Sequence, residues 1–316
     1  MTTRDRTTDT VIRCERVVKR FGDVVALDEL DLEVHAGTVV GYLGPNGAGK
    51  STTIRILLDL ARADSGAVRV LGHDPRAAGP GLRSRIGYLP GELRLDDRLR
   101  VHETLRSWAK MRGDGVDESY VAELCERLDL DLTRQNRNLS SGNRRKVGLV
   151  GAFMARPELL VLDEPTAGVD PLVQAEFLAL VDEARHEGRT VFLSSHVLSE
   201  VQRLADEVIV IRQGKVVAGG ALDDLRQQAL QPFTVWFNGP APIEELRALP
   251  SLSSLDVQHG TEVQGVVEGR PNELLRLLAR HEVVHLLLPE PDLEQAFLGY
   301  YDEPDAGPSE PGGVGP

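Results

Sequence analysis

The chain has 316 residues, 41% of them apolar, which is enough for the cores of one large or two modest domains. No stretch approaches the roughly 18 uninterrupted apolar residues of a membrane span, and residues 1–10 lack the apolar core of a signal peptide. The formal net charge of -13 argues against a nucleic-acid binder, because such proteins need a basic face to displace counterions from phosphates. We therefore expect a cytoplasmic protein with no nucleic-acid partner.

Three short apolar runs predict strands of one sheet. Residues 38–43 (TVVGYL) lead into a Gly-rich loop and then a helical pattern of apolar residues over 52–60. Residues 159–162 (LLVL) and 190–193 (TVFL) are each followed by polar residues and then a helical segment. This alternation indicates a parallel sheet covered by helices.

The region between the first two runs differs in character. Residues 98–156 contain helical patterns at 101–111 and 119–128 and hardly any strand signal. We expect a helical insertion over about residues 93–156.

Two apolar runs, 208–211 and 216–218, flank the turn residues Gln213–Gly214 and predict a closing hairpin. A proline beside Gln231 marks a boundary. We therefore expect a first domain over residues 11–230.

The rest of the chain predicts a small α+β accessory domain over residues 231–302. Its apolar stripes are typical of a core, and it has no charged cluster that suggests chemistry. The ends, residues 1–10 and 303–316, are polar or rich in Pro and Gly, so we expect them to be flexible. The expected strands are 234–237, 255–258, 263–268 and 283–288, and the expected helices are 272–281 and 292–301.

The loop after the first strand satisfies the pattern G-x-x-x-x-G-K-[ST] and opens a helix, which is the context that a phosphate-binding loop requires. Glycines let successive N–H groups turn toward phosphates, a lysine supplies charge at the β and γ oxygens, and a hydroxyl reaches Mg²⁺. We predict a nucleoside triphosphate site here. Its residues are Gly44, Pro45, Asn46, Gly47, Ala48, Gly49, Lys50, Ser51 and Thr52.

Two carboxylates follow the second predicted strand. Phosphoryl transfer to water needs one group to hold the metal and another to deprotonate the water, so we assign these roles to Asp163 and Glu164. His196 follows the third strand at the same sheet edge. It is either an ordinary polar loop residue or a hydrogen-bond partner of the γ-phosphate.

The segment 139–146 (LSSGNRRK) places small polar residues before an apolar helical pattern at 147–155. Ser140 and Ser141 can cap that helix, which would only stabilise it. The same helix start could also present N–H groups to a phosphate.

The order of these motifs resembles the nucleotide-binding subunit of an ATP-binding cassette (ABC) transporter over about residues 11–226. The resemblance implies a P-loop NTPase of the α/β class, in which a mixed sheet with flanking helices carries an antiparallel β subdomain and a helical subdomain. Residues 44–51 resemble the Walker A motif, 139–143 the LSGGQ signature and 159–164 the Walker B motif with its catalytic glutamate.

Further positions match the same family. Asp170 in 167–170 (AGVD) is placed like the D-loop aspartate, and His196 like the switch histidine. Phe21 is placed like the aromatic residue that stacks on adenine, and the alternative is a core phenylalanine.

Family likeness also implies that two such chains dimerise head to tail around two ATP molecules. The partner is a second copy or a paralogous ATPase. The signature of one subunit would then cap the γ-phosphate held by Lys50 of the other, through Ser140, Ser141, Gly142 and Asn143.

The chain departs from the family pattern at two motifs. The signature reads LSSGN where LSGGQ is usual. In 88–92 (YLPGE), Gly91 stands where the Q-loop glutamine is expected, so a metal contact would have to come from Glu92 or from water.

The signature and the extra C-terminal part resemble the drug-exporter ATPases of the ABC-2, daunorubicin-resistance-like type. This implies a separate permease with several membrane spans, a place at the cytoplasmic face of the membrane, and export of an amphipathic drug or antibiotic. The alternative is a soluble ABC ATPase acting on ribosomes or DNA. Such relatives generally carry two cassettes, long coiled coils or zinc cysteines, and the sequence contains none of these.

Overall fold

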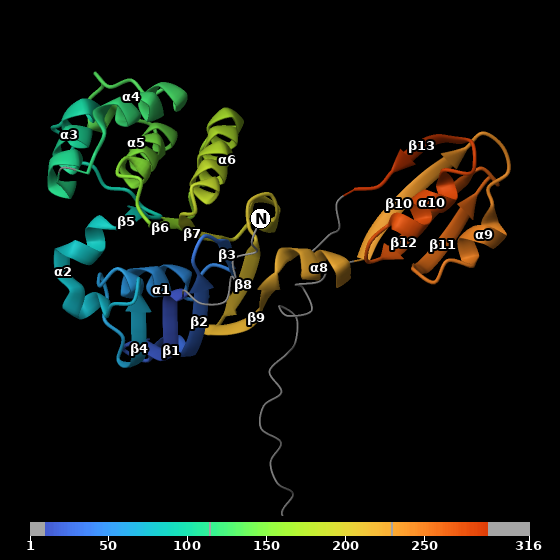
Figure 1. Cartoon of the computed structure of the whole chain (residues 1–316), viewed down its shortest axis with the longest axis horizontal. Coiled ribbons are helices and arrows are strands. Elements are labelled where there is room, and N and C mark those ends of the chain that lie inside the picture. Colours follow the sequence, from blue (N-terminus) through green and yellow to red (C-terminus); the bar gives the residue numbers. More distant parts are fainter. Residues whose placement is uncertain (1–9, 114, 229, 290–316) are drawn as a thin grey trace, which may run out of the picture. The chain divides into compact units, whose positions relative to one another are not determined.

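The structure is a computed structural model that describes residues 10–113, 115–228 and 230–289. The chain divides into two compact units, Met1–Gly219 and Gly220–Pro316 (Figure 1). The proline taken above as a domain boundary, Pro232, lies inside the strand Leu230–Phe237. The domain limits given above stay a prediction, and the helix expected at 292–301 lies outside the described residues.

A six-stranded sheet forms the centre of the first unit, and its strands are parallel from β5 to β8. All residues of β3, β6 and β7 are buried, and this double-sided burial explains why these strands are continuous apolar runs. The three predicted strands are confirmed. In spatial order the strands are β5 (Ile86–Leu89), β6 (Leu159–Asp163), β7 (Thr190–Ser195), β3 (Val39–Leu43), β8 (Glu207–Arg212) and β9 (Lys215–Ala221).

The hairpin expected near residue 213 is also present. Gln213 and Gly214 alone separate β8 from β9, with φ values of 47° and 79°. Two consecutive left-handed residues are the mark of a type I′ turn, whose twist matches that of the strands it joins.

A second sheet in this unit is antiparallel, in the order β2 (Val24–His35), β1 (Thr10–Phe21) and β4 (Ser65–Val70). Helix α1 (Lys50–Leu57) contacts β2 and β4 of this sheet and β6 of the large sheet. Its side chains Ile54 and Leu57 belong to the core that the two sheets share. Helix α2 (Pro75–Ser84) leads into β5.

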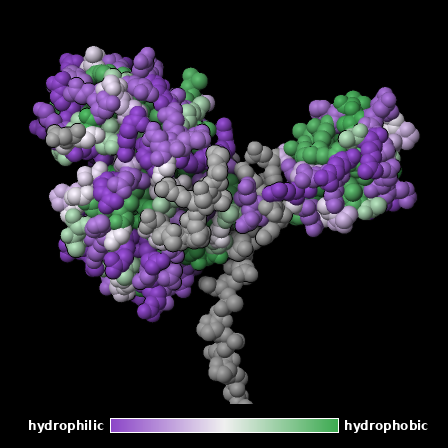
Figure 2. All heavy atoms as spheres, in the orientation of Figure 1, coloured by the Kyte–Doolittle hydropathy of each residue, from purple (hydrophilic) through white to green (hydrophobic). Residues whose placement is uncertain are grey.

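The helical insertion is confirmed and contains α3 (Val101–Arg112), α4 (Glu118–Arg127), a 3₁₀ turn (Asn136–Asn138) and α5 (Ser141–Phe153). Figure 1 shows α3, α4 and α5 gathered together, and hydrophilic residues cover most of the visible face over them (Figure 2). Helix α5 begins at Ser141 after its N-cap Ser140, so the polar segment 141–146 forms the first turns of the helix ahead of the apolar pattern that starts at 147. Helices α6 (Pro171–His186) and α7 (Leu198–Gln202) follow β6 and β7.

The second unit contains a β-α-β-β-α-β succession after α8 (Leu222–Gln228). Its sheet is antiparallel, with strand order β11-β12-β10-β13. Phe233, Val235 and Leu246 belong to its separate apolar core, so the predicted α+β character is confirmed. Its elements are β10 (Leu230–Phe237), α9 (Ile243–Arg247), β11 (Leu252–Gln258), β12 (Glu262–Glu268), α10 (Asn272–Leu278) and β13 (Val283–Leu287).

Candidate active site

The loop between β3 and α1 depends on glycine at two positions, where the backbone packs too closely against neighbouring strands for a side chain. A Cβ at Gly44 would lie 2.4 Å from the Ile211 carbonyl oxygen. Gly49 has a φ of 113°, and a Cβ there would lie 2.7 Å from the Ala26 carbonyl oxygen. These positions have no room for a side chain, which is why the loop can turn closely against β2 and β8.

Lys50 is the buried cation of this loop, with 6% of its side chain exposed. Its Nζ donates hydrogen bonds to the carbonyl oxygens of Gly44 at 2.5 Å and Pro45 at 3.4 Å. Thr53 Oγ1 donates to the Gly49 carbonyl oxygen one turn later. The ammonium group is therefore held at the mouth of the loop.

Asp163 and Glu164 end β6 in a strained turn. Glu164 has a φ of 51°, a left-handed conformation that costs free energy for a residue with a side chain. Its N–H donates to the carbonyl oxygen and to Oγ of Ser194, both at 3.2 Å. Ser194 Oγ in turn donates to Asp163 Oδ1 at 2.6 Å. Ser194 on β7 thus holds the Asp163 carboxylate and the main chain of Glu164.

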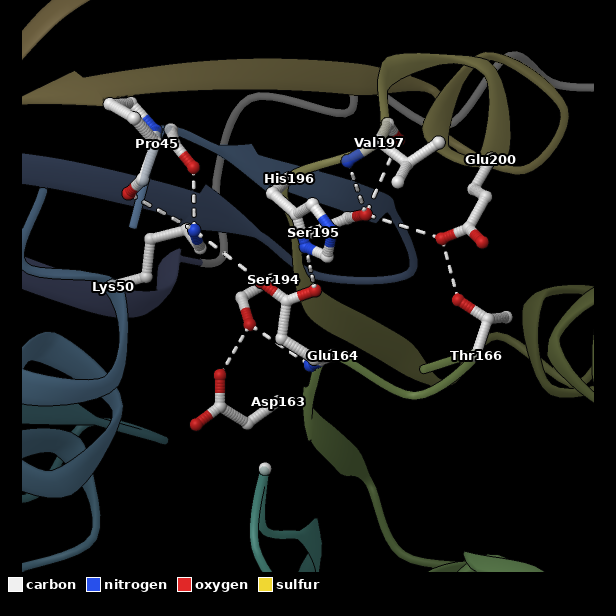
Figure 3. Close-up of polar contacts among 12 residues, drawn as sticks. Pro45, Lys50, Asp163, Glu164, Thr166, Ser194, Ser195, His196, Val197 and Glu200 are labelled. Atoms are coloured by element: carbon white, nitrogen blue, oxygen red, sulfur yellow. Dashed lines mark hydrogen bonds and ion pairs between the residues drawn. The ribbon is translucent and has the colours of Figure 1, made fainter. Parts of the chain in front are cut away.

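The Glu164 carboxylate connects two of the other predicted residues (Figure 3). Its Oε1 lies 3.4 Å from Lys50 Nζ, and its Oε2 lies 2.6 Å from His196 Nδ1. The structure therefore brings Lys50, Glu164 and His196 together at the carboxyl edge of β6 and β7, where open α/β sheets bind ligands.

A second carboxylate, on α7, links the loops after β6 and β7. Glu200 Oε2 accepts hydrogen bonds from Thr166 Oγ1 at 2.5 Å and Ser195 Oγ at 3.2 Å (Figure 3). Its Oε1 accepts one from Gln174 Nε2 of α6 at 3.3 Å. The loop that carries Glu164 and the loop that carries His196 therefore have a common anchor.

The signature segment caps α5. Ser140 Oγ accepts a hydrogen bond from the Asn143 N–H at 3.2 Å, while Ser141 is exposed and Gly142 half-buried in the first turn. Within the described residues, no hydrogen bond or ion pair joins residues 140–143 to the Lys50 cluster of the same chain.

Asp170 caps the following helix, α6. Its Oδ1 accepts hydrogen bonds from the N–H groups of Leu172 and Val173 at 3.1 Å, and these bonds lower the pKa of Asp170. A Cβ at Gly142 would lie 3.3 Å from the carbonyl oxygen of Gly168. The signature and the Asp170 loop are therefore neighbours within one chain.

Phe21 and Glu92 both lie at the surface. The Phe21 side chain ends β1 with 53% exposure, and Lys19 Nζ lies 5.1 Å from its ring centroid, which rules out the alternative of a core phenylalanine. Glu92 is 77% exposed and pairs with Arg94 at 3.1 Å. Gly91 instead lies against the site, since a Cβ there would be 3.1 Å from Asp163 Oδ2.

Sequence reasoning assigned no role to Ser194, Glu200 or Arg145. Ser194 and its neighbour Ser195 carried one usable signal, two hydroxyls directly after an apolar strand. The contacts of Glu200 and Arg145 join segments that are far apart in the chain, and local patterns carry no trace of them.

The donor set near Asp163 fits Mg²⁺. The cation prefers a few carboxylate or hydroxyl oxygens together with water and substrate phosphates, and Asp163 and Ser51 supply such oxygens. Among the described residues, no group of three or more His, Cys, Asp or Glu could hold a metal ion by itself.

The arrangement matches known proteins. Residues 27–167 match the family described as ABC transporter. The daunorubicin resistance ATP-binding protein DrrA3 of Streptomyces coeruleorubidus is 41% identical over 224 residues, which cover 70% of this chain and 71% of that protein. The chain belongs to the ABC transporter family.

A second relative matches nearly the whole chain, and a solved structure matches the fold of its larger part. The linearmycin resistance ATP-binding protein LnrL of Bacillus subtilis (strain 168) is 31% identical over 303 residues, covering 91% of this chain and 97% of that protein. A solved ATP-binding subunit of an ABC transporter is 30% identical in sequence and superposes with a TM-score of 0.64. The match covers 69% of this chain and 93% of the solved chain.

This ABC transporter protein therefore binds and hydrolyses ATP, as the resemblance implied. Among the described residues, its helices include none that is both long and apolar enough to cross a membrane.

Proposed function

We propose that this chain is the ATP-hydrolysing subunit of an exporter and that it drives a separate membrane permease. The observation that carries the proposal is the pair of contacts made by Glu164, to Lys50 at 3.4 Å and to His196 at 2.6 Å. One carboxylate thus touches both the residue that would bind phosphate and the residue that would sense it.

ATP binding follows from the loop and the helix behind it. The backbone N–H groups of residues 46–51 and the positive end of α1 favour phosphate oxygens. The γ-phosphate would compete with Glu164 for the Lys50 ammonium, because both are anions near the same cation. Phosphate binding would thereby release Glu164 from its ion pair.

Glu164 would then act as the general base. Its carboxylate takes a proton from the attacking water, the water oxygen bonds to the γ-phosphorus, and the bond from that phosphorus to the leaving oxygen of ADP breaks. When Nδ1 of His196 carries the ring proton, it donates to Glu164 and orients the carboxylate.

Mg²⁺ would be held by Asp163 and the Ser51 hydroxyl and would neutralise charge on the phosphate oxygens. Asp163 suits this role because Ser194 binds its Oδ1, which fixes the orientation of the carboxylate. Glu92 pairs with Arg94 at the surface. We therefore assign the place of the missing Q-loop side chain to water.

A complete site would need a second subunit, either a copy of this chain or a paralogous ATPase. The exposed residues Ser140 and Ser141, with the half-buried Gly142 and Asn143, would cap the γ-phosphate bound by the other subunit. Asp170 lies beside this segment and would contact the opposite site. Phe21, exposed at the end of β1, would stack on adenine.

The permease contact would lie beside residues 88–92. Leu93, Trp108 and Met111 line a groove of about 250 Å³ there, and Met111 is 73% exposed. An apolar segment of the permease would bury these side chains and hold the chain at the cytoplasmic face of the membrane. Because the named relatives confer resistance to daunorubicin and linearmycin, we assign an amphipathic drug or antibiotic as cargo.

The test is the variant Glu164→Gln. Without the base, hydrolysis should fall on the order of a hundredfold or more while ATP binding persists, so the protein should accumulate as an ATP-bound dimer. Phosphate release and size-exclusion chromatography with ATP measure the two effects. Wild-type hydrolysis by Glu164→Gln would refute the assignment, and co-purification with ribosomes instead of a permease would refute the transport role.

A further inference from the structure

Arg145 is a buried cation whose partners are main-chain carbonyls. It lies on the first part of α5 and is 7% exposed. Its Nη1 donates to the carbonyl oxygen of Pro90 at 2.7 Å, and its Nη2 donates to that of Gly91 at 3.1 Å. None of the ion pairs among the described residues includes Arg145.

The position is costly for a charged group. Burial lowers the pKa of Arg145, while the nearby charges of Asp163 and Glu164 act in the opposite direction. A guanidinium stays protonated in proteins, so folding must meet the cost of removing a cation from water. A purely structural link between α5 and a loop could be made with neutral groups at lower cost.

The loop that Arg145 holds is the one that departs from the family pattern. Gly91 stands where a glutamine side chain is usual, and its Cα faces Asp163 so closely that a Cβ would lie 3.1 Å from Oδ2. The backbone of this loop therefore packs directly against the acid assigned to Mg²⁺. Position 91 has no side chain to link the loop to the rest of the site.

We infer that Arg145 is a positioning residue that holds the Pro90–Gly91 backbone against Asp163 and ties it to the signature helix. The inference rests on the proposed function. The planar fork of the guanidinium suits two successive carbonyls. A displacement of residues 88–92 would thus reach both Asp163 and the helix that begins at Ser141, although Gly91 itself carries no functional group.

The first experiment measures steady-state hydrolysis and ATP binding for the full chain with Arg145→Met and Arg145→Lys. Arg145→Met removes both donors and should lower kcat on the order of tenfold, because the carbonyl oxygens of Pro90 and Gly91 lose their shared donor and the loop shifts. The affinity for ATP in EDTA should stay within about twofold, since Lys50 and its loop are unchanged. Arg145→Lys should recover part of kcat, because its ammonium can still donate to a carbonyl.

Arg112→Met is the matched control. Arg112 is also an arginine whose pKa is lowered by burial, and its Nη1 donates to the Ile86 carbonyl oxygen at 3.2 Å. Wild-type kcat is expected for this variant. An equal loss in Arg112→Met, or a kcat for Arg145→Met within twofold of wild type, would overturn the inference.

Gly91→Ala tests the same contact from the other side and leaves Arg145 in place. Gly91 is exposed, so the variant should fold, and its Cβ should displace the loop from Asp163 and lower kcat severalfold. The double variant with Arg145→Met should lose no more than the worse single variant, because both changes disturb one contact. An additive loss, or wild-type kcat in Gly91→Ala, would contradict the inference.

Glu164→Gln in the same assays separates this inference from the proposed function. If Glu164→Gln hydrolyses ATP normally, the assignment of the active site fails. If it is inactive while Arg145→Met and Gly91→Ala behave as wild type, only the positioning role fails.

Discussion

The two units bury different side chains. In the first unit, Lys50, Arg145 and Asp163 are all buried, and they lie around one sheet edge. In the second unit, the buried set among the described residues contains one polar side chain, Gln231, whose Nε2 donates to the Pro289 carbonyl oxygen at 2.6 Å. The remaining buried side chains there are apolar, such as Leu246.

The first unit gives up some folding stability to bury charged side chains, whereas the second unit buries almost only apolar ones. Buried charges cost stability unless they are paired, so a cluster of them indicates that chemistry is performed there. An apolar core only stabilises its own fold. We therefore expect changes in the first unit to alter catalysis and changes in the core of the second unit to alter stability.

The largest effect is expected at Lys50. Lys50→Ala removes the buried cation that lies at the loop mouth, so ATP affinity should fall on the order of a hundredfold or more. Fluorescent nucleotide titration measures this change. Lys215→Ala is the control, because Lys215 forms a surface ion pair with Asp28 and should bind ATP normally. Equal ATP affinity in both variants would show that the buried Lys50 contributes no more to ATP binding than a surface lysine does.

A smaller effect is expected at Glu200. Glu200→Ala removes the acceptor of Thr166 and Gln174 and leaves Ser195 Oγ only the Val197 carbonyl oxygen, so kcat should fall on the order of tenfold as the loops after β6 and β7 loosen. Glu200→Gln keeps one oxygen acceptor and should lose less.

Glu123→Gln is the control for Glu200, since Glu123 is 55% exposed and contacts Arg127 at the surface of α4. If Glu200→Ala and Glu123→Gln hydrolyse ATP at the same rate, the anchor has no part in catalysis.

The smallest effect on hydrolysis is expected in the second unit. Leu246→Ala removes a side chain with 0% exposure and should destabilise this unit by about 2–5 kcal/mol. Its kcat at 25 °C should match wild type. Differential scanning calorimetry checks the stability, with Leu275→Ala, at 40% exposure, as the control. A loss of kcat in Leu246→Ala would show that the two units are coupled in catalysis.

The strands that carry the site could be predicted from sequence because burial on both faces turns β3, β6 and β7 into uninterrupted apolar runs. The antiparallel sheet could only be expected from family likeness. Buried and exposed residues do not alternate regularly along β1 and β2. Arg16 and Glu29 adopt left-handed backbone conformations near register shifts, which interrupts the two-residue period.

The role of a residue could be predicted where the residue belongs to a single local sequence motif. Lys50 and Glu164 follow from local patterns, and the structure brings them together. The roles of Ser194 and Arg145 were not predicted, because each acts through contacts with a segment 30 or more residues away, and the two hydroxyls after the strand were the only local signal for Ser194. Hydrogen bonds of this range depend on the packing of β7 on β6 and of α5 on β5.

The left-handed backbone of Glu164 has an evolutionary consequence. Glycine or asparagine would fit a φ of 51° at lower cost, so selection for heat resistance alone would favour replacing this residue. Such a replacement would also remove the carboxylate that contacts Lys50 and His196. A replacement at position 164 that raises stability would therefore lower the rate of ATP hydrolysis. Thermostable variants obtained by directed evolution should be sequenced at this position and assayed for hydrolysis.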